Sequence, residues 1–144
     1  MEYEKVITIN SSEVSWESRE WGVDHLPVIK SETMEMHKKR VLSNSVGIPH
    51  IHHYETLYHV LEGELISISG DNLEHVEVQK CGSYVHVPKG LLHTVANVTS
   101  NDAITLVAHN VQDVENKCTT FADKQQLAQN IIEEYIKNHV LNNR

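Results

Sequence analysis

The chain has little of what several common classes of protein depend on. Its 144 residues hold 12 Lys and Arg against 20 Asp and Glu, a formal net charge of −8 at pH 7. It therefore lacks the basic face that binding to a phosphate backbone needs. No apolar run approaches the roughly 18 residues of a membrane span, and the N-terminus does not resemble a signal peptide. We expect a cytoplasmic protein with neither a nucleic acid nor a membrane as its partner.

Cysteine is also scarce. The two cysteines, Cys81 and Cys118, are far apart in the sequence, and their separation fits neither a disulfide framework nor a zinc knuckle. We expect two reduced thiols that pack as small buried apolar side chains.

Short stretches rich in β-branched and aromatic residues, separated by turn residues, run through most of the chain and predict strands. They lie at 4–9, 33–42, 56–61, 65–69, 76–78, 84–87, 94–98 and 104–108. We expect 16–29 to be loop with short pieces of strand. Many short strands at regular spacing are typical of a β-sandwich or β-barrel.

The C-terminal region has a different period. Leu127, Ile131 and Tyr135 recur every four residues, which predicts a helix that packs on the core or in a dimer. The residues 120–123 (TFAD) resemble a capping box ahead of it. The fold class predicted from the pattern is an all-β domain with a C-terminal α-helix.

Histidine, in contrast, is frequent. The chain has 11, and four of them, His50, His52, His53 and His59, fall in one short stretch. Because alternate residues of a strand point to the same side, His50 and His52 face together while His53 and His59 face the other way. We therefore expect the first two to share a site and the other two to lie on the surface or in sheet packing.

A third histidine that is able to join the pair follows a tight turn. The turn Pro88-Lys89-Gly90 comes just before His93, and its proline and glycine fix the backbone there. Two histidines on one face and a third held by a rigid turn suit a borderline divalent metal with open positions for water or substrate. The alternative is a metal-free barrel in which the histidines hydrogen-bond one another.

These two segments together resemble the cupin superfamily. Its first motif is a glycine, five residues, HxH, usually a glutamate after three or four more, and a glycine after another six. Here His50-Ile51-His52 and Gly63 match, whereas Asn44 replaces the first glycine and Thr56 the glutamate. The second motif is matched at every position, by Gly82, Pro88, Gly90, His93 and Asn97.

The resemblance, carried by residues 41–108, implies a double-stranded β-helix, a small jelly-roll barrel that is usually a homodimer. It also implies a divalent ion (Fe, Zn, Mn or Ni) held by His50, His52 and His93. We expect one cupin domain over 1–144, with N-terminal strands and loops in 1–40, the barrel core in 41–110 and the helix in 119–142.

The fourth ligand position stays open at this stage. Thr56 is a poor ligand while neutral, Glu55 would need a bulge to turn inward, and no motif places His86 or His109. A site of three neutral histidines is more positive than one with a carboxylate, which favours anionic or enolate-forming substrates.

The resemblance implies a metal-dependent enzyme acting on a small oxygenated or carboxylated metabolite, with a dioxygenase as one form. Alternatives are a redox-neutral zinc, manganese or nickel isomerase, cyclase or lyase, and a non-catalytic cupin that binds a small ligand. Thr56 and Tyr58 are the candidate catalytic residues, since they share the predicted face of the histidine pair. No general base is evident in the sequence.

Overall fold

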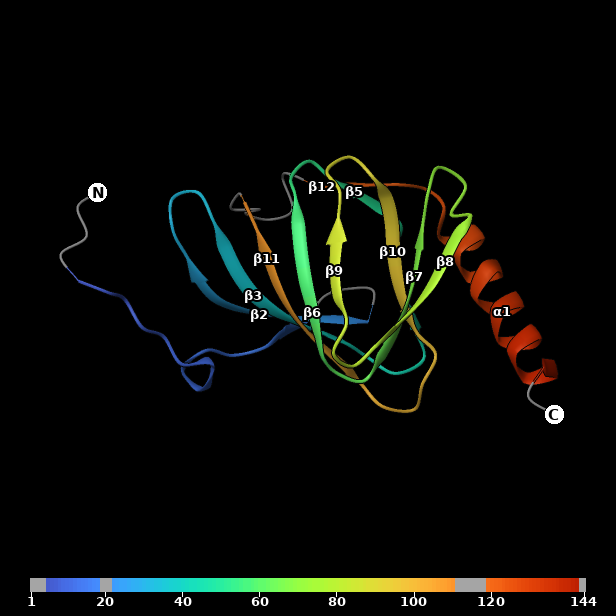
Figure 1. The fold of residues 1–144 in the computed structure, drawn as a ribbon, viewed down its shortest axis with the longest axis horizontal. Helices are drawn as coiled ribbons and strands as arrows, with labels where there is room; N and C mark the ends of the chain where they lie inside the picture. The colour runs from blue at the N-terminus through green and yellow to red at the C-terminus, as the bar shows by residue number, and fades with distance from the viewer. Residues whose placement is uncertain (1–4, 19–21, 111–118, 143–144) are drawn as a thin grey trace.

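The computed structural model describes residues 5–18, 22–110 and 119–142. Its strands form two antiparallel sheets, as predicted for a cupin jelly-roll (Figure 1). In the first sheet the order is β1 (Glu17–Ser18), β2 (Val23–Lys30), β3 (Glu35–Val41), β11 (Ala103–His109), β6 (Thr56–Glu62) and β9 (Tyr84–Val87). In the second it is β12 (Thr119–Phe121), β5 (His50–His52), β10 (Leu92–Asn97), β7 (Glu64–Ser69) and β8 (His75–Lys80), with β4 (Ser45–Val46) also pairing with β10.

The alternation of β11 shows how the first sheet meets the interior. Ala103, Thr105, Val107 and His109 are buried and alternate with half-buried residues. The buried set faces the space between the sheets, where Thr105 and Val107 line a cavity. A strand with one face in a barrel interior is expected to show this period of two.

The helix α1 (Gln125–Asn142) covers the outer face of the second sheet, on the opposite side of the molecule from β2 and β3 (Figure 1). Ala128 and Ile132 are buried there in one cluster with Ile66, Ile68 and Ala96. The predicted helix is therefore confirmed, and its packing is on the core. In the described ranges no helix is long and apolar enough to cross a bilayer.

The start of the helical region was predicted wrongly. Thr120 lies in β12, which pairs with β5, and the helix begins only at Gln125. Residues 120–123 are therefore not a capping box. The three-residue strand has too few positions to show a period in the sequence, and its hydrogen-bonding partner lies far upstream.

Two expectations for the N-terminal region were also wrong. Residues 5–10 form no strand, and Asn10 instead caps a short 3₁₀-helix, η1 (Ser11–Glu13). Residues 16–29, expected to be mostly loop, contain most of the eight-residue β2. Pro27 lies within this strand where the register with β3 shifts, and a bulge tolerates a residue without an N–H.

The expectation for the cysteines can be checked at one of them. Cys81 is exposed rather than buried, and its thiol donates to the carbonyl oxygen of Leu61 at 3.2 Å. It follows the end of β8, where the chain turns toward β9, and turns lie at the surface. Cys118 lies outside the described residues.

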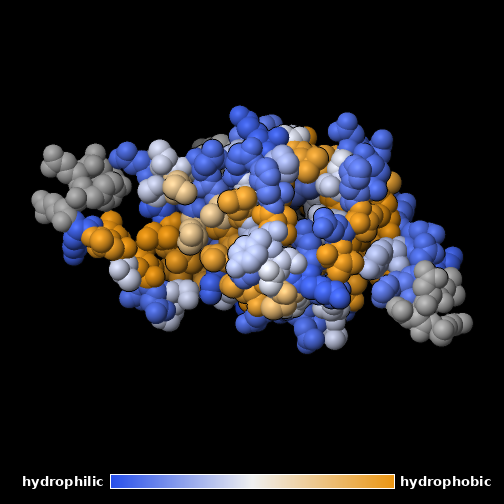
Figure 2. Space-filling model, viewed as in Figure 1, coloured by the Kyte–Doolittle hydropathy of each residue, from blue (hydrophilic) through white to orange (hydrophobic). Residues whose placement is uncertain are grey.

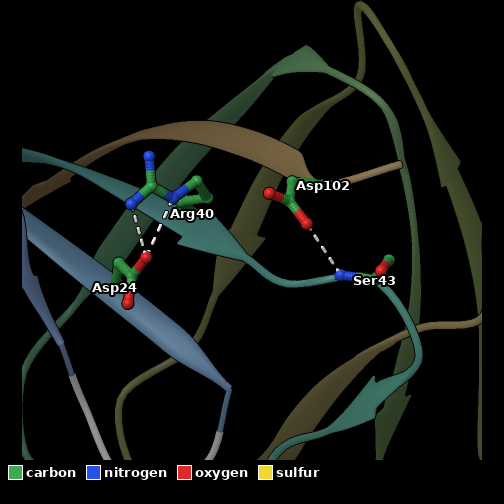
Figure 3. Close-up of polar contacts among 4 residues, drawn as sticks. All are labelled: Asp24, Arg40, Ser43 and Asp102. Atoms are coloured by element: carbon green, nitrogen blue, oxygen red, sulfur yellow. Dashed lines mark hydrogen bonds and ion pairs between the residues drawn. The ribbon is translucent and has the colours of Figure 1, made fainter. Parts of the chain in front are cut away.

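The turn after β3 explains one departure from the first cupin motif. The Ser43 amide donates to Asp102 at 2.9 Å, and the Arg40 guanidinium donates twice to Asp24 across β2 and β3 (Figure 3). The next residue, Asn44, has φ +55°. Asparagine is one of the few residues other than glycine that adopts this left-handed conformation readily, so it can replace the motif's opening glycine.

Candidate metal centre

His50, His52 and His93 meet between the sheets because of the pairing of two short strands. His93 on β10 is the register partner of His50 on β5, and His52 is two residues further along the same face. One ring nitrogen from each lies within 4.8 Å of those of the others, and the Nε2 atoms of His50 and His52 are 3.2 Å apart. The structure thus brings together the three histidines that the sequence predicted would share a site.

In each of the three rings the outer nitrogen, Nδ1, contacts a neighbouring group. The Nδ1–H groups of His50 and His93 donate to the carbonyl oxygens of Ile48 and Leu91, at 2.7 and 2.9 Å. His52 Nδ1 lies 2.9 Å from the hydroxyl of Thr119. A carbonyl accepts only from a protonated nitrogen, so His50 and His93 in their neutral form carry a lone pair on Nε2. Such outer contacts fix ring orientation at metal sites.

Burial keeps these rings in the form that binds metal. It lowers the pKa of the His93 imidazole to about 4 and that of His52 still further, with the charge of Lys39 acting in the same direction on both. At neutral pH these two rings are uncharged, as a metal ligand must be. Three imidazoles with anchored outer nitrogens, two of them kept neutral by burial, therefore fit a borderline divalent ion such as zinc or iron.

The three histidines border a small interior cavity of about 60 Å³, whose wall also includes Lys39, Thr56 and Tyr58. A space of this size holds a few water molecules or a few heavy atoms of a ligand. Lys39 brings a cationic side chain to the same cavity, which sequence reasoning missed. The signal was present in the alternation of Glu35, His37 and Lys39, but a polar face was not expected to point into a barrel.

The two candidate catalytic residues stand on the wall opposite the histidine pair. The predicted regular strand is broken, since β5 belongs to the second sheet and β6 to the first. Thr56 is buried, and its hydroxyl makes no hydrogen bond to any described residue. Tyr58 donates its phenol proton to Gln79, and burial raises its pKa above the usual range, so it keeps its proton at neutral pH.

The residues considered for a fourth ligand lie elsewhere. Glu55 points outward, and its carboxylate lies 2.7 Å from Nε2 of His86, both side chains being exposed. His109 faces the interior beside Tyr54 and Glu35. Within the part of the chain that the structure describes, the three histidines form a group without a fourth His, Cys, Asp or Glu.

His53 and His59 stay apart from the site, in keeping with the strand alternation. The exposed His53 contacts the Thr120 hydroxyl at 2.7 Å. His59 donates from Nδ1 to the carbonyl oxygen of Ser83 and stacks on Tyr84.

The last residue of the second motif, Asn97, is fully buried and donates to the carbonyl oxygens of Val41 and Asn101. Its role in the fold is therefore to tie the backbone of neighbouring turns.

Comparison with known proteins gives the family. The sequence profile described as Cupin matches residues 7–140. The chain belongs to the cupin family. No curated protein matches it.

Several solved cupin-like structures are similar to this cupin. The polyketide cyclase RemF from Streptomyces resistomycificus is 22% identical, with a TM-score of 0.66 over 75% of this chain and 81% of that one. An RmlC-like cupin from Shewanella frigidimarina is 16% identical, with a TM-score of 0.63 over 73% and 89%. An oxalate oxidase is 22% identical, with a TM-score of 0.61 over 74% of this chain and 58% of that one. At these identities the likeness shows the fold alone.

Proposed function

We propose that this cupin is a metal-dependent enzyme acting on a small oxygenated or carboxylated metabolite. The observation that carries the proposal is the anchored trio of His50, His52 and His93, whose rings border the same small cavity as Lys39. His52 and His93 are buried and His50 is half-buried. Enclosing their inner ring nitrogens costs free energy unless a partner satisfies them, and a metal ion would satisfy all three at once.

An ion held by these rings would supply Lewis-acid polarisation of a substrate oxygen, with redox chemistry added if it is iron(II). Lys39 would attract and orient a carboxylate or an enolate oxygen by its charge. The buried Thr56 hydroxyl has its hydrogen-bonding capacity available to a substrate or a water. Tyr58 keeps its proton and would serve as a neutral wall and hydrogen-bonding group.

The type of reaction depends on which ion is held. Iron(II) would favour a dioxygenase, whereas zinc, manganese or nickel would favour isomerase, cyclase or lyase chemistry on an enolisable substrate. RemF, which shares the fold, is a polyketide cyclase, and oxalate oxidase acts on a small carboxylate. Both chemistries are compatible with a cationic site, and the small cavity favours the small carboxylate.

The test begins with the metal content of untagged protein purified without added metal, beside His93→Ala. We expect the wild type to hold about one more iron, zinc, manganese or nickel ion per chain than His93→Ala. Each reconstituted form is then incubated in D₂O with small 2-oxo acids and 1,3-diketones. NMR measures the rate of hydrogen–deuterium exchange at the carbon next to the carbonyl, which is compared with the uncatalysed rate. An electrode measures oxygen uptake.

Exchange with oxygen uptake would support the dioxygenase, and exchange without uptake the redox-neutral enzyme. Tight metal binding with neither activity would move the non-catalytic binding cupin to first place. If the purified protein holds no metal and takes none up on reconstitution, the three-histidine site is wrong.

We further propose that the chain is a single cupin domain that forms a homodimer through the outer face of the first sheet. Helix α1 covers the second sheet, but Met36 and Leu57 are 43% and 59% exposed on the first. They flank Ala108 in register, and Figure 2 shows hydrophobic side chains gathered over this sheet and the N-terminal segment. Light scattering of the wild type and of Met36→Lys tests the dimer, which the added charge should weaken.

A further inference from the structure

A second group of metal-binding side chains lies in the same barrel, on strands that the trio does not use. His25 on β2 with Glu35 and His37 on β3 place one ligand atom each within 4.8 Å of one another. His109 on β11 lies beside Glu35, with Nε2 3.7 Å from Glu35 Oε1, but it is not within 4.8 Å of all three ligand atoms. We propose that His25, Glu35 and His37 form a second, structural site for a divalent transition metal, and this inference does not depend on the proposed function.

The surroundings of the His37 ring are the strongest sign that this group binds a metal ion. Its side chain is 3% exposed, yet neither of its ring nitrogens makes a hydrogen bond. The nearest carboxylate oxygen, Glu35 Oε1, is 3.4 Å from Nδ1, which is within reach of an ion pair but too long for a strong hydrogen bond. A buried ring whose two nitrogens lack hydrogen-bond partners lowers the stability of the fold. A metal ion bound between this ring and Glu35 would remove that free-energy cost.

The donor set selects the class of ion. Two imidazoles and one carboxylate are a ligand combination used for zinc and non-haem iron. A closed, four-coordinate structural zinc site needs a fourth donor, which His109 would supply if its side chain shifted toward the group. The carboxylate of Glu17 lies 3.8 Å from His25 Nδ1 and would act as the outer partner that orients a ligating histidine.

Tyr54 keeps the two groups distinct. Its ring stacks on His52 with centroids 4.8 Å apart and also contacts the ring of His109, which borders the second group, at 4.5 Å. Tyr54 thus occupies space beside both groups, and we treat them as separate sites. A metal at the second site would link β2 and β3, two neighbouring strands of the first sheet, and would stabilise the barrel.

Glu35 connects this group to the surface of the protein. Glu35 also lines a groove of about 570 Å³ on the first sheet, together with Ile7, Met34 and Met36. Glu35 therefore lies between the solvent-filled groove and the buried His37, and its carboxylate would be the first ligand that an entering cation meets. A workable site needs such an entry path as well as suitable ligands.

The test counts zinc in variants that separate the two sites. Protein is equilibrated with Zn²⁺ at a buffered free concentration in the nanomolar range, and bound zinc and the melting temperature are measured. The wild type should bind two zinc ions per chain, and His93→Ala one. Adding Glu35→Gln to His93→Ala keeps the side-chain volume but replaces the negatively charged carboxylate by a neutral amide, a much weaker ligand. It should weaken the remaining zinc by more than the 10- to 100-fold effect of an outer contact and abolish the zinc-dependent rise in melting temperature.

The matched control is Glu55→Gln, which removes a carboxylate that also contacts a histidine, His86, but on the surface. In the His93→Ala background it should leave the zinc count at one. The inference is overturned if His93→Ala binds no zinc, or if its zinc survives Glu35→Gln or is lost equally with Glu55→Gln. A wild type holding one zinc that depends on Glu35 and not on His93 would support the second site while contradicting the proposed function.

Discussion

Thr119 and His52 are register partners on adjacent strands, and the Thr119 hydroxyl lies 2.9 Å from Nδ1 of the ring. This contact holds the Nδ1 side of the His52 ring, a proposed metal ligand, and a substitution at Thr119 removes it without removing any of the three imidazoles. We expect Thr119→Val to weaken metal binding by about 10- to 100-fold, the usual effect of losing an outer partner. Competition with a chelator measures the change.

The adjacent threonine provides the control for that prediction. Thr120 makes the same kind of contact, 2.7 Å from Nε2 of His53, but that histidine is exposed and outside the site. Thr120→Val should therefore leave the metal affinity unchanged. Equal losses in the two variants would mean that the effect comes from β12 as a strand and not from the bond to His52.

Two neighbouring lysines allow the charge of the cavity to be tested. Lys39 borders the cavity of the trio, whereas Lys38 is not among the residues lining it. Lys39→Met should weaken the binding of oxalate to the metal-loaded protein by about tenfold, since a charge near a small anion in a partly buried site contributes more than about 1 kcal/mol. Calorimetry of Lys39→Met beside Lys38→Met measures this, and similar losses in both would refute a specific role for Lys39.

The buried histidines make the stability of the metal-free protein depend on pH. Burial lowers the pKa of His93 to about 4 and that of His37 to about 3, whereas both titrate near 6.5 when unfolded. Below that value the unfolded chain takes up protons that the folded chain does not, so stability falls with falling pH. For His93 the loss is complete near pH 4 and reaches about 3 kcal/mol.

Urea unfolding in the presence of a chelator, at pH values between 7 and 4.5, gives the slope of that loss. His37→Gln should reduce the slope by about one proton, or about 1.4 kcal/mol per pH unit. His53→Gln, on the surface, should not change it. A stability that stays flat over this range would contradict the burial of neutral rings.

The helix offers a pair of isoleucines for testing how α1 contributes to stability. Ile132 is 3% exposed against the second sheet, and Ile136 is 41% exposed. Ile132→Ala should lower the free energy of unfolding by about 2–4 kcal/mol, since it leaves a cavity in a packed cluster. Ile136→Ala should cost less than about 1 kcal/mol. Chemical denaturation monitored by circular dichroism distinguishes them, and equal losses would place the core of the helix elsewhere.

The parts of the fold that could be predicted are those whose residue pattern lies within one short stretch of sequence. β7 and β9 have clear residue patterns bounded by glycine turns, and the stripe from Leu127 to Tyr135 has a helical period. The histidines of the trio could be chosen because two share a strand face and the third follows Pro88 and Gly90. These relationships need only a few consecutive residues.

What the sequence could not give depends on contacts between distant segments. The second group of metal-binding side chains and the neighbouring His109 are spread over β2, β3 and β11, and the strand that carries His25 was expected to be mostly loop. Lys39 faces the cavity because β3 is paired with β11, a pairing between residues more than 60 positions apart. No local pattern records such a pairing, so these residues are recognised only once the sheets are assembled.

The pairing of β5 with β12 also has a consequence for how the protein is made. Two of the three histidines lie on β5, but Thr119, which holds His52, is 67 positions further along the chain. During synthesis the early part of the barrel would emerge from the ribosome well before that hydroxyl exists, and closing so long a loop is a slow step. A nascent chain stopped before β12 should therefore load metal poorly, so the metal would be acquired at the end of translation and not while the barrel first forms.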